Sequence, residues 1–410
     1  MSMWRESANQ NSMDMELLFA MTICVLALIN GFYNAVNTVV KTFFTYNSWH
    51  IPFFFAIGGI FFARNSLKKK FLPFLLKKCR TLLVPALFVN LCYGLISNLM
   101  RSYGLVKFGK AISFDSLFLA PFMENYQFQN DLCLWLLFQL FVIEIIMKAI
   151  YRIPGLRKMK YFDLSVLIFT LIISFVCITL SKTGTKYALG TLFLGRTGFL
   201  LFFFTFGIFY ERHLKQFLEK KDMAIRGCYI ALILQTVVMY FSNWTSNYDV
   251  RTMGTSNLSN TFLPFFNFLT AFTFLICLSR LLSPLLKESR MLGFIGNDLH
   301  YVIYHFQFFG MLISLYALLL CGAGKAELLN KFEPTDFLKN RWYAATFVGN
   351  GFGKIPYLIL PFFGPLLTAK LINKLPHRLM RFLGWCIALV LSLIVIMIVG
   401  ISLREYLGTL

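Results

Sequence analysis

The sequence predicts an all-α protein, a polytopic membrane bundle of about ten or eleven transmembrane helices. Hydrophobic residues make up 58% of the 410 residues and charged residues only 14%, which is more apolar surface than a water-soluble domain can bury. Apolar runs that approach the length of a membrane span, about 20 residues as a helix, recur from end to end. These runs are continuous rather than alternating, which favours helices over the strands of a barrel.

Eleven candidate spans follow one another in a helical region, 17–403, between a polar amino-terminal tail, 1–16, and a short carboxyl-terminal tail, 404–410. The second span is short, and a re-entrant second segment would reduce the count to ten. The tenth span contains Pro356 and Pro361, which predict a break in its helix. The spans are predicted at about 17–38, 48–63, 81–100, 132–150, 161–181, 191–210, 226–242, 260–279, 299–321, 343–367 and 382–403.

The distribution of lysine and arginine predicts how the bundle lies in the membrane. With the amino terminus in the cytoplasm, most of the 39 basic residues fall in cytoplasmic segments, above all in the basic stretch 64–80. Basic loops resist translocation, so the net charge of +21 is explained without a nucleic-acid partner. The first span is predicted to be retained as an anchor. The nine cysteines are scattered singly and predict no metal site.

Ionisable side chains inside predicted spans are costly to bury, so each is a candidate functional group. They are His50, Glu144, Arg196, His300 and His305. Simpler interpretations exist for some of them. The Arg196 side chain could snorkel to the membrane interface from the outer end of its helix. His305 could make only a polar packing contact.

His50 opens the second span, at its outer mouth in the predicted orientation. Pro52 suits the first turn of a helix, so the imidazole is expected at a helix start. Two interpretations follow: an interfacial ring beside Trp49, or a general base that faces a polar cavity. Gly58 and Gly59 predict the close approach of a neighbouring helix.

The stretch HIPFFFAIGG, which begins at His50, resembles the signature HMPLFFFISG of the membrane acyltransferase-3 family. Four further stretches agree in order along the chain, so the resemblance covers about 17–400. In KKCRTLLVP, Lys77 and Arg80 stand at the two basic positions of the family's Arg-x-x-Arg motif. IGNDL, followed by His305, is similar to the late GKNSL…His segment.

Two aromatic-rich stretches also match the family. Trp135 lies in LWL, where the family has LWFL, and Arg196 precedes a phenylalanine-rich span as an arginine does in the family. The resemblance implies that these two residues face the substrate or the oxyanion. Lys77 and Arg80 would bind the acyl donor, although ordinary anchoring by positive charge on the cytoplasmic side is the simpler interpretation.

The resemblance implies an integral membrane O-acyltransferase in the bacterial cytoplasmic membrane. Acetyl-CoA or another acyl-CoA would be the donor substrate, with no bound cofactor. The acceptor would be a membrane-linked or surface carbohydrate. The sequence leaves the oligomeric state open.

One departure from the family concerns the first span. The family carries there a histidine taken to be catalytic, whereas the corresponding slot here reads ALING with Asn30. Asparagine forms hydrogen bonds but does not take up a proton at neutral pH. Either His50 supplies the base, with Asn30 and His305 completing the catalytic site, or the chain is a non-catalytic transporter or exporter of a glycan or lipid.

Overall fold

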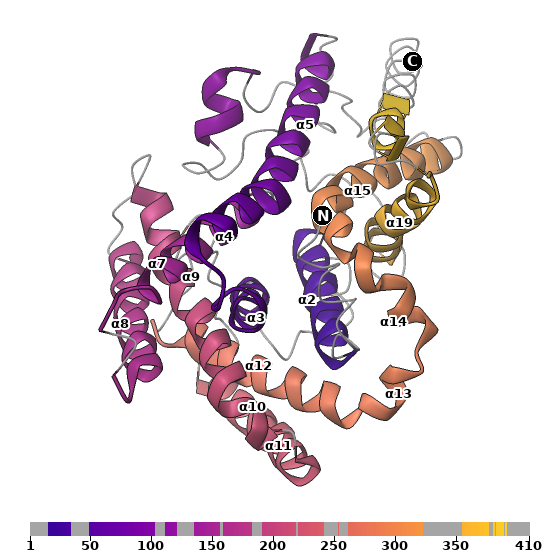
Figure 1. Cartoon of the computed structure of the whole chain (residues 1–410). Helices are drawn as coiled ribbons and strands as arrows, with labels where there is room; N and C mark the ends of the chain where they lie inside the picture. Colours follow the sequence, from indigo (N-terminus) through magenta and orange to yellow (C-terminus); the bar gives the residue numbers. More distant parts are fainter. Residues whose placement is uncertain are drawn as a thin grey trace.

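The protein is described by a computed structural model, in which regular structure is helical throughout the described residues (Figure 1). This confirms the predicted all-α class. The described residues are 15–33, 49–102, 111–120, 135–155, 159–182, 191–218, 220–241, 253, 261–322, 355–376, 380–381, 383–388 and 390–391. The main helices are α2 (Met15–Tyr33), α3 (His50–Asn65), α4 (Phe71–Lys78), α5 (Val84–Ser102), α7 (Trp135–Ile150), α8 (Phe162–Lys182), α9 (Thr191–Phe209), α11 (Lys221–Phe241), α12 (Leu263–Leu281), α15 (Leu299–Gly322) and α19 (Pro356–Asn373).

Shorter elements connect them. They are the π-helical turns η1 (Cys79–Leu83), η2 (Asp115–Leu119) and η4 (Tyr210–Leu214), the helices α10 (Lys215–Leu218), α13 (Ser283–Lys287) and α14 (Arg290–Ile295), and the 3-10 turn η5 (Gly296–Asp298).

Five helical stretches of the described chain are long and apolar enough to cross a membrane, which supports a multi-pass membrane protein. They are Phe71–Asn98, Phe162–Ser181, Leu192–Leu218, Lys221–Tyr240 and Leu263–Leu281. The full count of ten or eleven spans stays a prediction.

Two predicted helix boundaries were wrong. The third span does not begin at 81, because α4, η1 and α5 form one helical run from Phe71. The π-helical turn η1 comes just before Pro85, where a missing backbone N–H interrupts the regular hydrogen bonding of an α-helix. In the tenth span, α19 starts with proline in its first turn and then continues through Pro361, so the predicted break there is absent. Residues 343–354 lie outside the described part.

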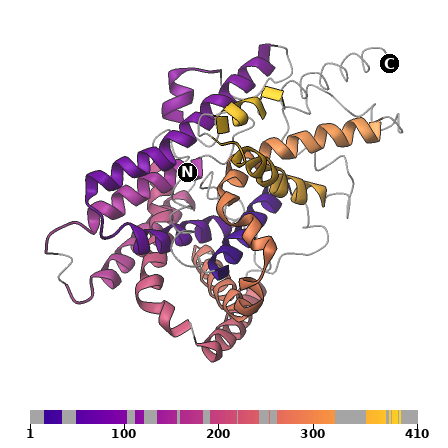
Figure 2. The same cartoon turned by 45° about the vertical axis from the view of Figure 1, so that its right-hand side comes forward.

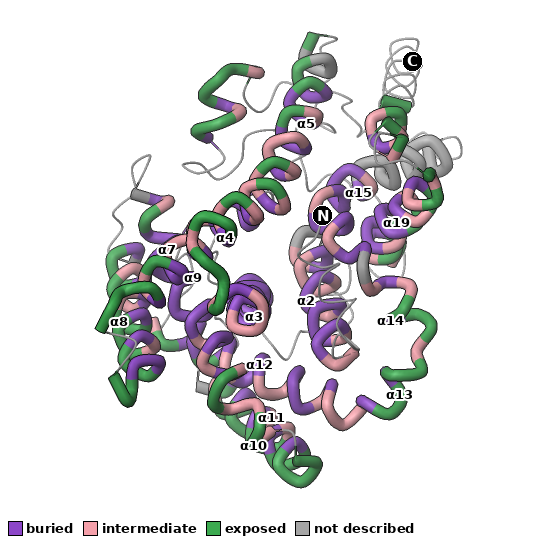
Figure 3. Tube along the Cα trace, in the orientation of Figure 1, coloured by how far each residue is buried: buried purple, intermediate pink, exposed green. Residues whose placement is uncertain are grey.

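Helix α3 lies at the centre of the bundle. Figure 1 shows it nearly end-on, with α9, α12, α2 and α4 around it, and Figure 3 colours most of it as buried. Thirteen of its 16 residues are buried. At about 1.5 Å per residue the helix is about 24 Å long, shorter than a hydrocarbon core of about 30 Å. A helix that other helices surround has no lipid thickness to match, which explains its short length.

Helices α3 and α9 pack with their backbones nearly in contact. A Cβ atom added to Gly59 would lie 2.0 Å from the carbonyl oxygen of Phe204, and one added to Gly207 would lie 1.9 Å from that of Ala56. Only glycine permits this distance. The prediction that Gly59 allows a neighbouring helix to approach is confirmed.

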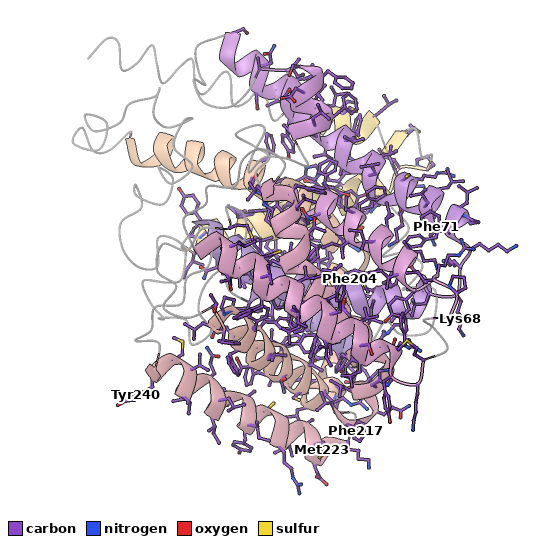
Figure 4. All side chains as sticks on the ribbon, turned by 90° about the vertical axis from the view of Figure 1, so that its left-hand side faces the viewer. Lys68, Phe71, Phe204, Phe217, Met223 and Tyr240 are labelled. Carbon is purple, nitrogen blue, oxygen red and sulfur yellow. The ribbon has the colours of Figure 1, made fainter. Side chains whose placement is uncertain are left out.

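Helices α8 and α11 cover α9 and α12 and form the outside of the bundle. Large apolar side chains on both are exposed, such as Phe169 and Ile172 on α8 and Ile233 and Tyr240 on α11. Figure 4 shows side chains from this side projecting away from the ribbon. An apolar surface of this kind is typical of helices that face lipid. On the other side of α2, helices α15 and α19 run side by side in Figures 1 and 2.

One end of the bundle gathers charged residues, and we call it the charged end. Figure 4 places Lys68 and Met223 at this end and Tyr240 at the opposite end. Three ion pairs lie at this end. Each of them joins two segments that the distribution of lysine and arginine predicts to be on the same side of the membrane. They are Glu16–Arg280 at 2.7 Å, Arg64–Glu211 at 2.7 Å and Asp163–Arg212 at 2.5 Å. The predicted cytoplasmic segments therefore meet at one end, and the cytoplasmic side itself stays a prediction.

Candidate active site

His50 is the first residue of α3, as predicted, and its side chain is buried with 3% of its surface exposed. The Trp49 ring lies edge-on to the imidazole, with centroids 6.2 Å apart. The Cys24 thiol on α2 donates a hydrogen bond to the backbone oxygen of His50 at 3.1 Å. A ring in an interfacial aromatic belt would be exposed, whereas His50 is buried where α2 packs against the start of α3.

Asn30 lies further along α2 than the residue that contacts His50. Helix α2 starts at the charged end with Glu16, and α3 reaches that end with Arg64. Cys24, whose thiol contacts the His50 backbone, lies six residues before Asn30, or about 9 Å along α2. Figure 1 shows α3 nearly end-on and α2 along its length, so the two helices are not parallel. Asn30 is buried, and α2 packs against α3.

Arg196 and Trp135 meet between α9 and α7. Fifteen residues separate Arg196 from Glu211, and thirteen separate Trp135 from Lys148, which are both residues of the charged end. Helix α9 packs against both α3 and α7. The four predicted site residues thus lie on helices that pack against α3 or belong to it: Asn30 on α2, His50 on α3, Trp135 on α7 and Arg196 on α9.

The Arg196 side chain does not snorkel. It is fully buried, and its guanidinium carbon lies 4.7 Å above the centre of the buried Trp135 ring. A cation held on the face of an indole is stabilised by the ring quadrupole, which offsets part of the cost of burial. Gln139 and Thr197, the neighbours of this pair on α7 and α9, hydrogen-bond to each other. A hydropathy plot does not reveal the contact between Arg196 and Trp135, because this contact joins two different helices.

His305 lies in a different environment from His50. Its Nδ1 atom is 3.0 Å from the hydroxyl of Tyr93 on α5, and its ring stacks on Trp385 with centroids 4.7 Å apart. Seven residues separate it from Asp298, which pairs with Lys370 at 3.0 Å, so it lies only about 10 Å along α15 from that pair. Figure 1 shows α2 between α3 and α15. The described contacts of His305 do not include His50.

Lys77 and Arg80, the residues predicted to bind the acyl donor, lie in different environments at the charged end. Lys77 is half-buried and lines a small pocket, which we call the lysine pocket, whereas Arg80 is exposed. The lysine pocket lies between the end of α3 and the start of the α4–α5 run. Its polar and charged lining includes Asn65, Ser66, Lys69, Lys77, Lys78 and Thr81.

A buried ion pair behind the lysine pocket was not identified as part of the site from the sequence. Lys78 Nζ lies 2.6 Å from Glu144 Oε1, and both side chains are almost fully buried. One turn further along α7, Lys148 Nζ donates to the backbone oxygens of Ser66, at 2.5 Å, and Leu67, at 3.0 Å. The spacing of Glu144 and Lys148 was a usable signal, because residues four apart share one face of a helix. These contacts fix the loop that carries Lys69.

Glu144→Leu is expected to destabilise the protein by about 3–5 kcal/mol, because it leaves the Lys78 ammonium buried without its counter-charge. The double variant Lys78→Met, Glu144→Leu should recover most of that loss, since replacing a buried pair by apolar residues of similar volume is often neutral. Thermal unfolding in detergent measures both, with the exposed Glu288→Gln as the control. A double variant no more stable than Glu144→Leu would contradict this account of the pair.

Within the described ranges, no group of three or more His, Cys, Asp or Glu side chains could hold a metal ion.

These features define a helical membrane protein with polar and charged side chains buried around a central helix. Residues 18–401 match the family model described as an acyltransferase domain, and the chain belongs to this acyltransferase 3 family. The match confirms the resemblance read from the sequence and supports a membrane acyltransferase. Neither the comparison with curated proteins nor that with solved structures found a match.

Proposed function

We propose that the protein is an O-acyltransferase of the bacterial cytoplasmic membrane that moves an acyl group, by default acetyl, from acyl-CoA to an extracytoplasmic carbohydrate such as a surface polysaccharide or glycolipid. The observation that carries the proposal is the buried pair of Arg196 and Trp135, because α9, which carries Arg196, packs against the central helix α3 and its buried His50. Acyl-CoA is a substrate in this scheme, and no bound cofactor is required.

The proposed chemistry assigns one role to each group. His50 takes the proton from the acceptor hydroxyl as its oxygen attacks the thioester carbonyl. Arg196 is the positive group that stabilises the oxyanion of the tetrahedral intermediate, held in place by Trp135. The intermediate collapses to the ester, and the departing coenzyme A thiolate takes the proton back from the imidazolium. Asn30 supplies a hydrogen bond to a reacting group, and His305 remains a second candidate for the base.

The acyl donor would enter from the charged end. Coenzyme A carries phosphates, and the lysine pocket offers three ammonium groups at the inner end of α3. Of these, Lys69 and Lys77 lie toward the surface, whereas Lys78 is buried against Glu144. The exposed guanidinium of Arg80 follows within one helical turn of Lys77 and can hold a further phosphate oxygen.

The test is thioester consumption by the purified full-length protein. Release of the coenzyme A thiol from acetyl-CoA is followed with a thiol reagent, with and without a carbohydrate acceptor. We expect Lys77→Ala and Arg80→Ala to raise the donor KM about tenfold or more, since a charge-assisted hydrogen bond contributes about 1.5–3 kcal/mol. The exposed Lys68→Ala, outside the pocket, is the matched control. Equal donor KM values in all three variants would overturn this donor site.

A second candidate function is a transporter or exporter of a glycan or lipid that has lost catalysis. Asn30 favours it, because asparagine replaces the histidine expected in the first span. Absence of thioester consumption, together with acceptor transport in reconstituted vesicles, would establish this alternative.

A further inference from the structure

Lys148, in the last turn of α7, carries its charge in a buried position behind the lysine pocket. Its Nζ atom donates to the backbone oxygen of Ser66 at 2.5 Å and to that of Leu67 at 3.0 Å. The same atom lies 5.4 Å from the centre of the Phe74 ring. A buried ammonium is costly unless it is hydrogen-bonded, so these contacts hold the two carbonyl groups and the ammonium together.

The Ser66 carbonyl group connects Lys148 to Lys69. Its oxygen also accepts a hydrogen bond, at 3.2 Å, from the backbone N–H of Lys69. A carbonyl oxygen has two lone pairs, so it can accept both bonds. Ser66 is the C-cap of α3, and its own N–H donates to the oxygen of Phe62. The turn after α3 is therefore anchored by α3 on one side and by Lys148 on the other, and Lys69 of this turn lines the lysine pocket.

The opposite wall of the lysine pocket is held from the same face of α7. Glu144 lies one turn before Lys148 and binds Lys78 at 2.6 Å. Lys77 and Lys78 are the last two residues of α4. Helix α7 thus holds the turn that carries Lys69 with one side chain and the end of α4 with another, and these contacts fix the two walls relative to each other.

We propose that Lys148 is a positioning residue, which holds the turn after α3 and through it places the Lys69 ammonium for a phosphate of coenzyme A. This inference rests on the proposed function, because it takes the lysine pocket to be the donor site. Lys148 lies behind the lining of the pocket and acts through Lys69. A lysine side chain is flexible, so a fixed backbone beneath it reduces the conformational freedom that is lost when the ligand binds.

The experiment measures the affinity of the purified full-length protein for coenzyme A by titration calorimetry in detergent. Lys69→Gln is expected to lower the affinity about tenfold or more, the equivalent of one charge-assisted hydrogen bond. Lys148→Met is expected to lower it about three- to tenfold, since it weakens the same bond indirectly. The double variant should bind no more weakly than Lys69→Gln alone, because Lys148 acts through Lys69.

Three further variants separate positioning from a general loss of charge or stability. Lys160→Met removes an exposed ammonium outside the pocket and should leave the affinity unchanged. Lys148→Arg keeps the charge and the donors and should restore part of the affinity. Gln235→Leu breaks the buried hydrogen bond to Asn267 between α11 and α12, so it should lower the unfolding temperature without changing the affinity. Additive losses in the double variant, or an equal loss of affinity in Gln235→Leu, would overturn the proposal.

Amide hydrogen exchange distinguishes failure of this inference from failure of the proposed function. Residues 67–70 should exchange faster in Lys148→Met than in the unmodified protein, because the turn loses its anchor. Unchanged exchange would overturn the positioning role even where coenzyme A binds. Absence of coenzyme A binding to the unmodified protein would overturn the donor site, and the exchange rates then decide whether Lys148 holds the turn. If Lys148→Met does not fold, Lys148→Gln, which keeps a neutral donor, is measured in the same way.

Discussion

Gly207→Ala is expected to prevent assembly of the bundle, with a loss of about 3 kcal/mol or more in stability. The new Cβ atom would lie 1.9 Å from the carbonyl oxygen of Ala56, 2.7 Å from its carbonyl carbon and 3.0 Å from its Cα atom. All three are backbone atoms of the central helix α3, so no side chain can rotate away. Helices α3 and α9 would have to move apart.

The measurement is the yield of monodisperse protein and its unfolding temperature in detergent. Gly59→Ala should act in the same way, because it places a Cβ atom 2.0 Å from the carbonyl oxygen of Phe204 on the facing helix. Gly293→Ala in α14 is the matched control, since nothing lies within 4 Å of its Cβ position. Normal yield and unfolding temperature for Gly207→Ala would contradict the close packing of α3 and α9.

Much of the fold follows from the sequence because apolar length and charge are local properties. The all-α class and the shared end of the basic segments needed only the runs of hydrophobic residues and the positions of lysine and arginine. The close approach of another helix at Gly59 could also be predicted, because glycine in an apolar helix has few other roles. The start of the third span at Phe71 was missed because Lys77, Lys78 and Arg80 suggested a loop. In the structure, Lys78 is buried on a helix because Glu144 neutralises it.

The candidate site was predictable only in part, because it depends on which helices are neighbours. The sequence placed His50 at a helix start, and the structure agrees. It left open whether the Arg196 side chain snorkels to the interface or faces the site, and in the structure α7 brings the Trp135 ring onto the guanidinium, which is fully buried. His305 was grouped with His50 by family resemblance, yet its described partners are Tyr93 and Trp385. Contacts between helices far apart in the sequence leave no periodic signal.

The roles of His50 and Asn30 can be tested together. Asn30→His restores a titratable ring to the first span, on the helix that packs against α3. If both residues serve one site, this substitution should raise the rate of transfer in the otherwise unchanged protein. It should also partly rescue a protein that lacks the His50 imidazole. The readout is again coenzyme A release at saturating donor and acceptor.

His50→Ala is expected to reduce acyl transfer about a hundred- to ten-thousand-fold, the usual contribution of a general base, and the loss should persist at saturating donor and acceptor. Because His50 is buried and its ring contacts Trp49, truncation should also cost about 0.5–3 kcal/mol of stability. Rates are therefore compared below the unfolding temperature of the variant. His213→Ala at the charged end, a histidine with 46% of its side chain exposed, is the control and should keep its rate. Near-normal turnover by His50→Ala would remove His50 from the reaction and transfer the role of base to His305.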